Sequence, residues 1–368
     1  MSFYEEMKQL SQMDLDTFFT SLTDVRIDAI LQKSKIRYMD FLALLSPRAQ
    51  DHIEDMAQKA HEITKRQFGR TISLFTPLYV SNYCTNQCLY CSFNYKNKIR
   101  RRQLSLEDVE REAMEIAKFG LKHILILTGD APRIASIDYL ESCIQILNRY
   151  FPSVSIEIYA LTEDEYARLI QAGVDGLTIY QETYDEKLYQ RLHVKGPKSD
   201  YRFRLDAPER ACRAHMRTVN IGALLGLFDW RKDAFLTGMH ADYLQRKFPD
   251  TEIAVSLPRL RPHLGEFQPA VIVSDIDVVQ IMTAIRIFMP RCGITISTRE
   301  NAEFRNNILP LGVTKMSAGS CTAVGGRTAE EERTGQFEIS DERSVPEMVH
   351  MLEKAGWQPV YKDWQSIA

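Results

Sequence analysis

The feature that most constrains the fold of this chain is a repeated alternation of strand-like and helix-like segments that begins near Thr76. Short runs rich in β-branched and aromatic residues recur, and between them lie stretches whose apolar residues have helical spacing. There are eight such runs: Pro77–Tyr83, Ile124–Thr128, Val154–Ala160, Gly176–Gln181, Val219–Leu225, Ile253–Leu257, Ile294–Thr298 and Lys315–Ala318. This alternation predicts a parallel sheet with right-handed crossovers, and eight strands can close into a (β/α)8 barrel. We therefore predict an α/β fold of the TIM-barrel type; the alternative is an open doubly wound sheet, which usually has fewer strands.

Five amphipathic helices are predicted between these strands: Leu106–Phe119, Ile137–Arg149, Glu163–Ala172, Lys232–Phe248 and Ile276–Phe288. Two of them end at a glycine, Gly120 and Gly173, the residue type that commonly follows the last helical turn. Ser136 precedes the second helix and is a suitable N-cap, because its hydroxyl can accept a hydrogen bond from a free backbone N–H.

The predicted barrel lies between two flanking segments. Residues 1–70 form a helical N-terminal extension, because apolar residues such as Ile27, Ile30 and Leu31 recur at helical spacing. Residues 71–320 form the barrel, and residues 321–368 form a short C-terminal tail packed on it, with a helix near Val345–Lys354. The sequence shows no internal repeat, low-complexity tract or proline- and glycine-rich linker, so a second domain is not expected.

Composition and charge argue against several classes of protein. The 368 residues are 45% hydrophobic, which suits one large globular domain with a full core. The net charge of -3, from 46 basic and 49 acidic residues, argues against a nucleic-acid or membrane-surface binder. There is no apolar signal region, and the longest apolar stretch, near Ile221 to Phe228, is too short for a bilayer, so we expect a cytoplasmic location. The basic run from Lys96 to Arg102 is interpreted as a solvated loop or lid edge.

Three of the seven cysteines crowd together directly after the first predicted strand, in the pattern C-x3-C-x2-C. Cys84, Cys88 and Cys91 can face one iron–sulfur cube and leave its fourth iron open for chemistry. The alternative is a structural zinc site, which needs four ligands and commonly uses two cysteine pairs or a pair with histidines. No second C-x2-C pair follows, and the nearest histidine, His123, begins a predicted strand. The ligand count therefore favours an iron–sulfur cluster.

A C-x3-C-x-aromatic-C motif after the first strand of a βα barrel resembles the radical S-adenosylmethionine (SAM) superfamily. The resemblance implies a [4Fe–4S] cluster on Cys84, Cys88 and Cys91, whose fourth iron is chelated by the amino and carboxylate groups of SAM. Tyr90 is the aromatic residue that shields the cluster in this motif. One electron from the cluster would then cleave SAM to methionine and a 5′-deoxyadenosyl radical.

Polar residues at the carboxyl ends of the strands are the candidates for cofactor binding, because barrel active sites lie there. Gly129 and Asp130 resemble the superfamily's glycine-plus-acid motif, which receives the amino group of SAM; their alternative is an ordinary turn. Gln181 and Glu182 end the fourth strand, where an unpaired carboxylate is costly, and by resemblance they face the ribose or the methionine part of SAM. Arg204 falls where relatives place an arginine near the methionine carboxylate; otherwise it lies on a solvated helix face.

Arginine and serine residues at two further strand ends indicate a substrate with a free carboxylate. Ser256 and Arg259 lie at the end of the sixth predicted strand, and Ser297 and Arg299 at the end of the seventh. An arginine fork can bind a carboxylate through two parallel hydrogen bonds. We predict that Arg299, with Ser297 or Ser256, holds the amino-acid group of the substrate; the alternative for the arginines is an Arg–Glu surface pair.

Several stretches, in order along most of the chain, are similar to the tyrosine lyases, the 2-iminoacetate synthases of anaerobic thiamine biosynthesis. They are Val80–Lys98, Leu125–Asp130, Gly176–Thr183, Gly196–Arg210, Asn220–Leu227, Val255–Pro262, Ile296–Glu300 and Met316–Gly326. The resemblance implies cleavage of the Cα–Cβ bond of L-tyrosine to 2-iminoacetate (dehydroglycine) and p-cresol, which supplies the thiazole of thiamine. It also implies a complex with the thiazole synthase, and flavodoxin or ferredoxin as electron donor. Because the imine hydrolyses in water, the N-terminal extension and the C-terminal tail are expected to cap the barrel.

The sequence leaves three alternatives to a tyrosine lyase to consider. A radical SAM lyase acting on another aromatic amino acid, such as tryptophan, would have a similar barrel. The related [FeFe]-hydrogenase maturase has a further domain with a second cysteine cluster, whereas only Cys321 follows the eighth predicted strand, so that activity is not expected. The third alternative is of another class, a non-catalytic zinc-bound barrel that acts as a binding scaffold.

Overall fold

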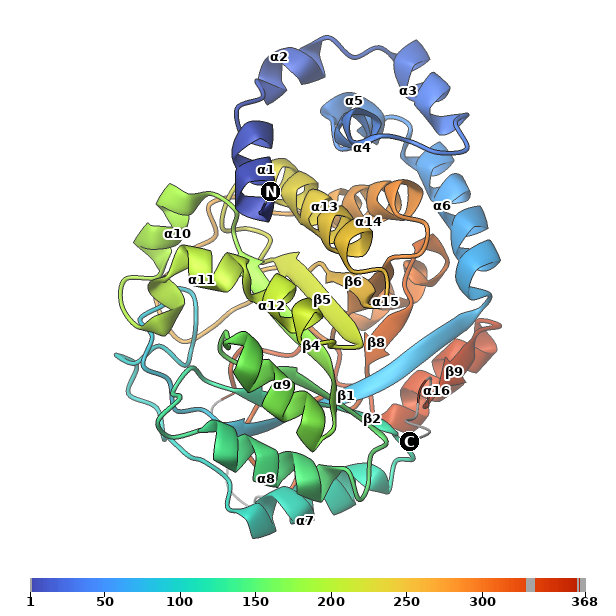
Figure 1. Cartoon of the computed structure of the whole chain (residues 1–368). Coiled ribbons are helices and arrows are strands. Elements are labelled where there is room, and N and C mark those ends of the chain that lie inside the picture. Colours follow the sequence, from blue (N-terminus) through green and yellow to red (C-terminus); the bar gives the residue numbers. More distant parts are fainter. Residues whose placement is uncertain (1, 329–334, 363, 365–368) are drawn as a thin grey trace.

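Eight parallel strands form a closed barrel in the computed structural model, which describes residues 2–328, 335–362 and 364 (Figure 1). Each strand pairs with the next along the chain, and β1 pairs with both β2 and β8, which closes the barrel. The strands are β1 (Thr71–Ser81), β2 (His123–Thr128), β3 (Ser153–Glu157), β4 (Val174–Glu182), β5 (Thr218–Ala223), β6 (Glu252–Ser256), β7 (Gly293–Ile296) and β8 (Lys315–Ser317). The predicted (β/α)8 fold is confirmed, and the open doubly wound alternative is wrong.

All five predicted crossover helices are present. They are α7 (Leu106–Ala117), α8 (Ile137–Leu147), α9 (Glu163–Ala172), α13 (Trp230–Lys247) and α14 (Asp275–Phe288). The Ser136 hydroxyl caps α8 by accepting from the Tyr139 amide at 3.2 Å. Gly173 ends α9 in the left-handed conformation with φ 113°, and Gly120, with φ 79°, follows α7 in the same way. The end signals in the sequence therefore mark real helix ends.

Several short helices on the crossovers were not predicted. They are α10 (Glu186–Leu192), the 3-10 turn η1 (Pro197–Ser199), α11 (Tyr201–Leu205), α12 (Ala207–Arg213), α15 (Ala302–Asn307) and the 3-10 turn η2 (Leu309–Leu311). None is longer than about two turns, so none gives a clear apolar periodicity in the sequence. Four of these six elements lie between β4 and β5, where they shape one wall of the site described below.

The N-terminal segment is helical, as predicted, with α1 (Phe3–Leu10), α2 (Leu15–Thr20), α3 (Asp24–Leu31), α4 (Tyr38–Leu44), α5 (Pro47–Gln50) and α6 (Ile53–Phe68). These helices lie beside α13 and α14 (Figure 1). Gln280 of α14 donates to the carbonyls of Leu44 and Ser46 at 2.9 and 2.8 Å, and the Phe3 ring stacks on His240 with centroids 4.0 Å apart. The segment thus buries its apolar side against the outer helices of the barrel.

The C-terminal tail contains the predicted helix, α16 (Val345–Lys354), and a strand that was not predicted, β9 (Gln358–Val360). Strand β9 pairs in parallel with the start of β1. Residues 329–334, 363 and 365–368 of the predicted 321–368 segment, and Met1, lie outside the described residues. One hydrophobic core joins residues from Phe3 to Trp357, and the segment boundaries at residues 70 and 320 stay predictions.

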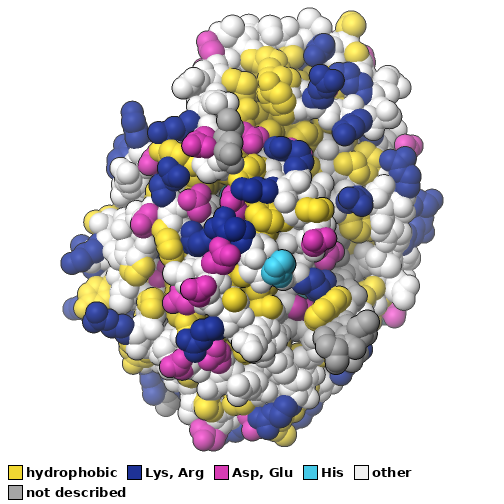
Figure 2. Space-filling view, in the orientation of Figure 1, with side chains coloured by type: hydrophobic (Ala, Val, Ile, Leu, Met, Phe, Trp, Pro, Cys, Tyr) yellow, Lys and Arg dark blue, Asp and Glu magenta, His cyan; other side chains and the backbone are white. Residues whose placement is uncertain are grey.

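Charges of both signs are interspersed over the face of the molecule seen in Figure 2, as the small net charge suggests. Hydrophobic side chains gather in the upper part of this view, where the N-terminal helices lie. Within the described part of the chain, no helix has the length and apolar character needed to cross a membrane.

Candidate active site

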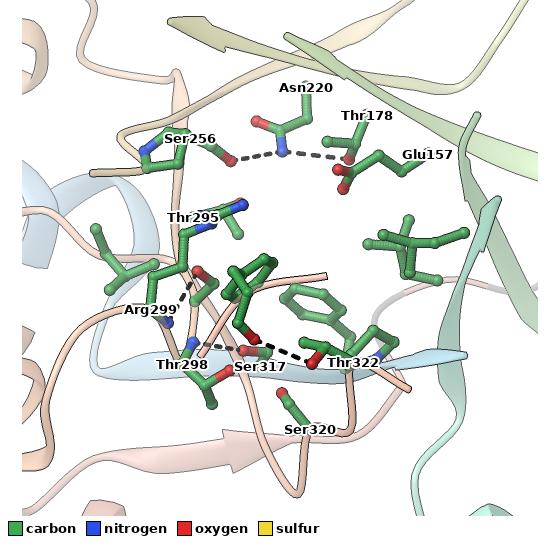
Figure 3. Close-up of a pocket in the computed structure, with 18 of the residues that line it drawn as sticks. Glu157, Thr178, Asn220, Ser256, Thr295, Thr298, Arg299, Ser317, Ser320 and Thr322 are labelled. Carbon is green, nitrogen blue, oxygen red and sulfur yellow. Dashed lines mark hydrogen bonds between the residues drawn. The ribbon is translucent and has the colours of Figure 1, made fainter. Parts of the chain in front are cut away.

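Two adjoining hollows at the carboxyl ends of the strands contain most of the predicted site residues. The first, here called the cysteine pocket, is lined by Cys84, Cys88 and Cys91 and by residues that end β2, β3 and β4. The second, here called the barrel cavity, lies inside the barrel, and all eight barrel strands contribute to its walls (Figure 3). Glu157 and Arg299 line both hollows, so a group bound in one borders on a group bound in the other.

The end of β2 fixes the loop that carries the cysteines. The backbone carbonyl of Asp130 accepts hydrogen bonds from the Thr85 amide and hydroxyl, both at 2.9 Å. A carboxylate oxygen of Asp130 accepts from the Asn86 side-chain amide at 2.7 Å. Asp130, which the sequence analysis assigned to SAM, therefore lines the cysteine pocket and also positions the loop between Cys84 and Cys88.

Gly129 is required by close packing against the same loop. A Cβ atom at this position would lie 2.3 Å from the Tyr83 carbonyl oxygen and 3.0 Å from the Cys84 Cβ. The Gly129 amide donates to the Ser81 carbonyl at 3.0 Å, which holds the two strand ends together. Besides its resemblance to the cofactor motif, Gly129 therefore meets a packing requirement of the backbone beside the first cysteine.

Arg101 holds the other side of the cysteine loop. Its guanidinium donates to the backbone carbonyls of Asn82 and Phe93 at 2.7 and 3.0 Å, and to the carbonyl of Asn94 at 2.7 Å. The basic run was interpreted as a solvated loop or lid edge; Lys96 is exposed, as a solvated loop implies, whereas Arg101 is partly buried and holds the cysteine loop. A planar donor fork that satisfies several carbonyls at once stiffens an irregular loop.

The three thiols face one pocket and suit a group larger than a single ion. None of the three is in a disulfide; burial raises the pKa of Cys84 to about 12, with Asp130 adding to the shift. The Thr128 hydroxyl and His263 Nε2 are buried on the same walls and have no hydrogen-bond partner among the described residues, which suits a bound polar group. Across the described ranges, no three His, Cys, Asp or Glu side chains are grouped to hold one metal ion.

Tyr90 is fixed on the wall of the cysteine pocket, and its role as the shielding aromatic residue stays a prediction. Its hydroxyl lies 2.7 Å from His193 Nε2, and His193 Nδ1 lies 2.7 Å from the Tyr189 carbonyl. Because a carbonyl can only accept, Nδ1 carries the proton and Nε2 accepts from Tyr90. Burial lowers the pKa of His193 to about 3, so the ring is neutral and this arrangement is stable at physiological pH.

Opposite charges meet on the wall formed by the end of β4. Lys198 Nζ donates to Glu182 Oε1 at 2.5 Å, and the guanidinium of Arg204 lies 3.7 Å from the same oxygen. Burial alone would raise the pKa of Glu182, but Lys198 and Arg204 reverse this effect and lower it, so the carboxylate is ionised. Arg204 also donates to the Tyr180 carbonyl at 2.8 Å and is buried, which excludes the solvated-face alternative.

Lys198 is a site residue that the sequence analysis missed. Its amide donates to Asn86 Oδ1 at 3.0 Å, although the two residues are 112 positions apart. Gly196 makes this approach possible, because a Cβ there would lie 2.2 Å from Asn86 Oδ1. No periodicity or motif in the sequence pointed to Lys198, since only the folded loop brings it to the cysteines.

The backbone of Glu182 is strained. Its φ of 70° lies in the left-handed region, and the pairing of β4 with β5 shifts register between Tyr180 and Glu182. A non-glycine residue in this conformation costs on the order of 1–3 kcal/mol and is found mainly at functional sites. The bulge aims the carboxylate into the cysteine pocket, where Lys198 and Arg204 hold it.

Two predicted site residues lie outside both hollows. Gln181 lines neither, and its buried amide has no hydrogen-bond partner among the described residues. The guanidinium of Arg259 forms ion pairs with Glu300 and with Asp275, the second at 2.7 Å, and also lines neither hollow. An Arg–Glu pair was the alternative to substrate binding, but it was expected at the surface, whereas Glu300 is buried. The assignments of Gln181 and Arg259 stay predictions without support from the geometry.

The barrel cavity contains the other three predicted substrate residues, Ser256, Ser297 and Arg299. The guanidinium of Arg299 stacks 3.5 Å from the centroid of the Phe337 ring and forms no ion pair within the described chain. Glu157, at the end of β3, was missed because the strand was predicted to run on to Ala160, which placed Glu157 inside it and not at its end. Its carboxylate forms no hydrogen bond or ion pair with described residues, and burial raises its pKa to about 7, partly offset by Arg299.

The walls also show what covers the site. Gln336 and Phe337 of the C-terminal tail line the cysteine pocket, and the Tyr79 hydroxyl donates to Gln336 at 2.7 Å. The expected cap by the tail is therefore present. No described residue that lines either hollow comes before Phe75, so the expected cap by the N-terminal extension is wrong. That segment packs on the outer helices instead.

A (β/α)8 barrel with three thiols and paired charges at its mouth defines the class of radical SAM enzymes. Accordingly, the family model of the radical SAM superfamily matches residues 78–236, and that of the biotin and thiamin synthesis associated domain matches residues 256–358. The chain is 37% identical over 366 residues to the 2-iminoacetate synthase of Escherichia coli (strain K12), covering 99% of this chain and 97% of that one. It belongs to the 2-iminoacetate synthase family.

Solved structures agree with this placement. The maturase HydG of the [FeFe]-hydrogenase has a TM-score of 0.91 at 33% identity, over 98% of this chain and 80% of that chain. HydG from Carboxydothermus hydrogenoformans has a TM-score of 0.90 at 31% identity, over 98% and 85% of the two chains. Enzymes of the radical SAM superfamily use a [4Fe–4S] cluster and SAM, and the three thiols with the unpaired polar walls fit both.

Proposed function

We propose that this chain is a radical SAM lyase that cleaves the Cα–Cβ bond of L-tyrosine. The products are 2-iminoacetate (dehydroglycine) and p-cresol, with 5′-deoxyadenosine and methionine as coproducts, and the imine supplies the thiazole of thiamine. The observation that carries the proposal is that an unpaired arginine and an unpaired carboxylate, Arg299 and Glu157, share one cavity beside the cysteine pocket. Two unpaired opposite charges in one cavity complement the carboxylate and ammonium of a free amino acid.

Cys84, Cys88 and Cys91 would hold the [4Fe–4S] cluster, and Asp130, Glu182 and Arg204 would surround SAM in the same pocket. When bound, the cluster and SAM together supply a 5′-deoxyadenosyl radical that removes a hydrogen atom from the substrate. Lys198 contributes a positive charge near Cys88 and holds Glu182, so this wall balances charge around the thiolates.

The chain's own residues orient the amino acid and exclude water. Arg299 would bind the carboxylate, and its stacking on Phe337 leaves the donor edge of the guanidinium free. Glu157 would bind the ammonium group of the substrate, whose positive charge would favour the ionised form of this carboxylate. Phe337 borders both hollows and keeps water from the reacting groups.

The proposal includes partners and a location. A one-electron donor such as flavodoxin or ferredoxin would reduce the cluster, and the thiazole synthase would take up the imine in a complex. A cytoplasmic location is supported by the chemistry of the thiols: all seven cysteines are free, as expected in a reducing compartment.

The test is an anaerobic assay of the protein with a reconstituted cluster, SAM, dithionite and tyrosine, in which p-cresol and 5′-deoxyadenosine are measured by chromatography. Both products are expected, and both should vanish in Cys88→Ala. Deoxyadenosine without p-cresol would mean that the radical chemistry is right and the substrate is not tyrosine; tryptophan would then be assayed. A colourless protein that holds zinc, contains no iron and forms neither product would overturn the proposal in favour of a scaffold.

A further inference from the structure

The barrel cavity has two chemically different ends. At one end, Glu157 and Arg299 are shared with the cysteine pocket. At the other end, Thr178, Asn220 and Thr295 are shared with a small hollow at the floor of the barrel. An amino acid held by Arg299 and Glu157 therefore has its reacting groups beside the cysteine pocket and its side chain directed toward the floor.

The walls between the two ends are mainly apolar. Leu127 and Ile296 line this part of the cavity, and Phe75 and Leu125 line it down to the floor hollow. Such walls suit an aromatic ring, whose large apolar surface they remove from water. A phenol oxygen at the far end of that ring would need a polar partner near the barrel floor.

Asn220 supplies an unsatisfied polar atom at this end. It lies on β5 and is only 8% exposed, and its side chain points into the cavity (Figure 3). Its Nδ2 donates to the Ser256 hydroxyl at 2.8 Å and to the Thr178 hydroxyl at 3.3 Å. Its Oδ1 is buried and has no hydrogen-bond partner among the described residues. If the oxygen and nitrogen of this amide exchange places, the hydroxyls can still satisfy the atom that they contact, and the other polar atom of the amide is still left without a partner.

Ser320 is the rival for the same role, because its hydroxyl is also unpaired and also lines the barrel cavity. It does not line the floor hollow, however, so it lies away from the end of the cavity where the phenol oxygen would be. A phenol hydroxyl is both donor and acceptor and so matches either atom of the Asn220 amide.

We propose that Asn220 binds the phenol hydroxyl of the substrate and selects tyrosine over aromatic amino acids that lack this group. The inference rests on the proposed function and adds the residue that sets its specificity. Ser256, predicted as a substrate contact, then acts as a positioning residue, because it fixes the amide through the 2.8 Å hydrogen bond. A site built to hydrogen-bond a substrate hydroxyl rejects an analogue without it strongly, since the buried partner is then left unpaired.

The test compares tyrosine and phenylalanine on the protein with its cluster and SAM but without reductant, so that binding is measured apart from chemistry. Dissociation constants are measured by calorimetry for the wild type, Asn220→Leu, Asn220→Ser and the control Asn307→Leu, whose position is exposed at the end of α15. In Asn220→Leu we expect the tyrosine dissociation constant to rise about 10- to 100-fold and that of phenylalanine to change less than about threefold. Asn220→Ser also removes the amide and should show the same loss of affinity for tyrosine. It replaces the leucine variant in the test if that variant does not fold. Asn307→Leu should match the wild type.

The outcomes separate this inference from the proposed function. If the wild type forms p-cresol but the Asn220 variants keep the preference for tyrosine, only the proposed role of Asn220 is overturned. The same holds if these variants lose affinity for both ligands equally. Wild-type protein that neither binds tyrosine nor forms p-cresol overturns the proposed function and this inference together.

Discussion

The Gly129→Ala substitution tests whether the end of β2 sets the position of the cysteine loop. The added Cβ would lie 2.3 Å from the Tyr83 carbonyl oxygen, whereas real Cβ atoms do not approach other heavy atoms closer than 3.0 Å. Either the strand end or the loop must therefore move by at least about 0.7 Å, the difference between these two distances. Because the obstacle is backbone and not a flexible side chain, we expect a loss of about 1–3 kcal/mol in unfolding free energy.

Gly129→Ala should affect cluster binding and the reaction rate more than it affects stability. A displacement approaching 1 Å in a catalytic constellation costs on the order of 100-fold in rate. The assay measures iron content and visible absorbance after anaerobic reconstitution, the initial rate of p-cresol formation, and the free energy of unfolding in urea. Gly129→Ala should lose iron and about 100-fold in rate.

Gly293→Ala is the matched control for this prediction. Its Cβ would meet Ala254 at 2.9 Å, at the amino end of β7 and away from the cysteines. It should lose stability but keep its iron and most of its rate. If Gly129→Ala retains full iron content and full rate while the wild type is active, the packing argument is refuted.

Three further predictions concern charge. Arg299→Leu should raise the KM for tyrosine about 10- to 100-fold, because the substrate carboxylate loses a charged partner. Chromatography should still show deoxyadenosine formed without p-cresol in this variant. Arg101→Met should remove the hydrogen bonds to three loop carbonyls, lowering the unfolding free energy by roughly 2–4 kcal/mol and the iron content after reconstitution. Burial raises the pKa of Asp233 from 3.8 to about 7, which means that the folded state favours the protonated carboxyl. The contribution of this protonation to the unfolding free energy is therefore complete below about pH 4 and is lost as the pH rises through about 7. Urea unfolding at pH 5 and pH 8 should show Asp233→Asn gaining roughly 2–3 kcal/mol relative to the wild type over this range.

The fold was largely predictable because each barrel strand is buried and flanked by an amphipathic helix. The misses have a physical cause. β1 was predicted to begin at Pro77 but begins at Thr71, and its first residues pair with β8 and β9, which are distant in sequence. β9 has three residues, one of them a proline, so neither length nor alternation marks it as a strand. Pairing between such distant segments leaves no local pattern in the sequence.

The site was predictable where one segment carries the chemistry and unpredictable where distant segments share it. The spacing of Cys84, Cys88 and Cys91 along the sequence is enough to predict them as cluster ligands. Glu157 ends β3 as Glu182 ends β4, but the third strand was predicted to extend to Ala160, so the argument used for Glu182 did not reach Glu157. Lys198 could not have been found in this way, since it lies on a crossover between short helices and reaches the site only by packing on the cysteine loop.

The wall formed by Glu182 combines two features that are each unfavourable, a left-handed backbone and a buried carboxylate. A left-handed backbone and a buried carboxylate each cost free energy, and the two cations that offset the carboxylate come from different segments, Lys198 from η1 and Arg204 from α11. With all three in place, the carboxylate is already ionised and fixed before any ligand arrives. Binding then requires little rearrangement of charge, which is the condition under which fixed dipoles and ions stabilise a reaction most effectively. Removing Lys198 alone would leave the strain of Glu182 in place with less to offset it, so stability and cofactor binding at this wall depend on the same contacts.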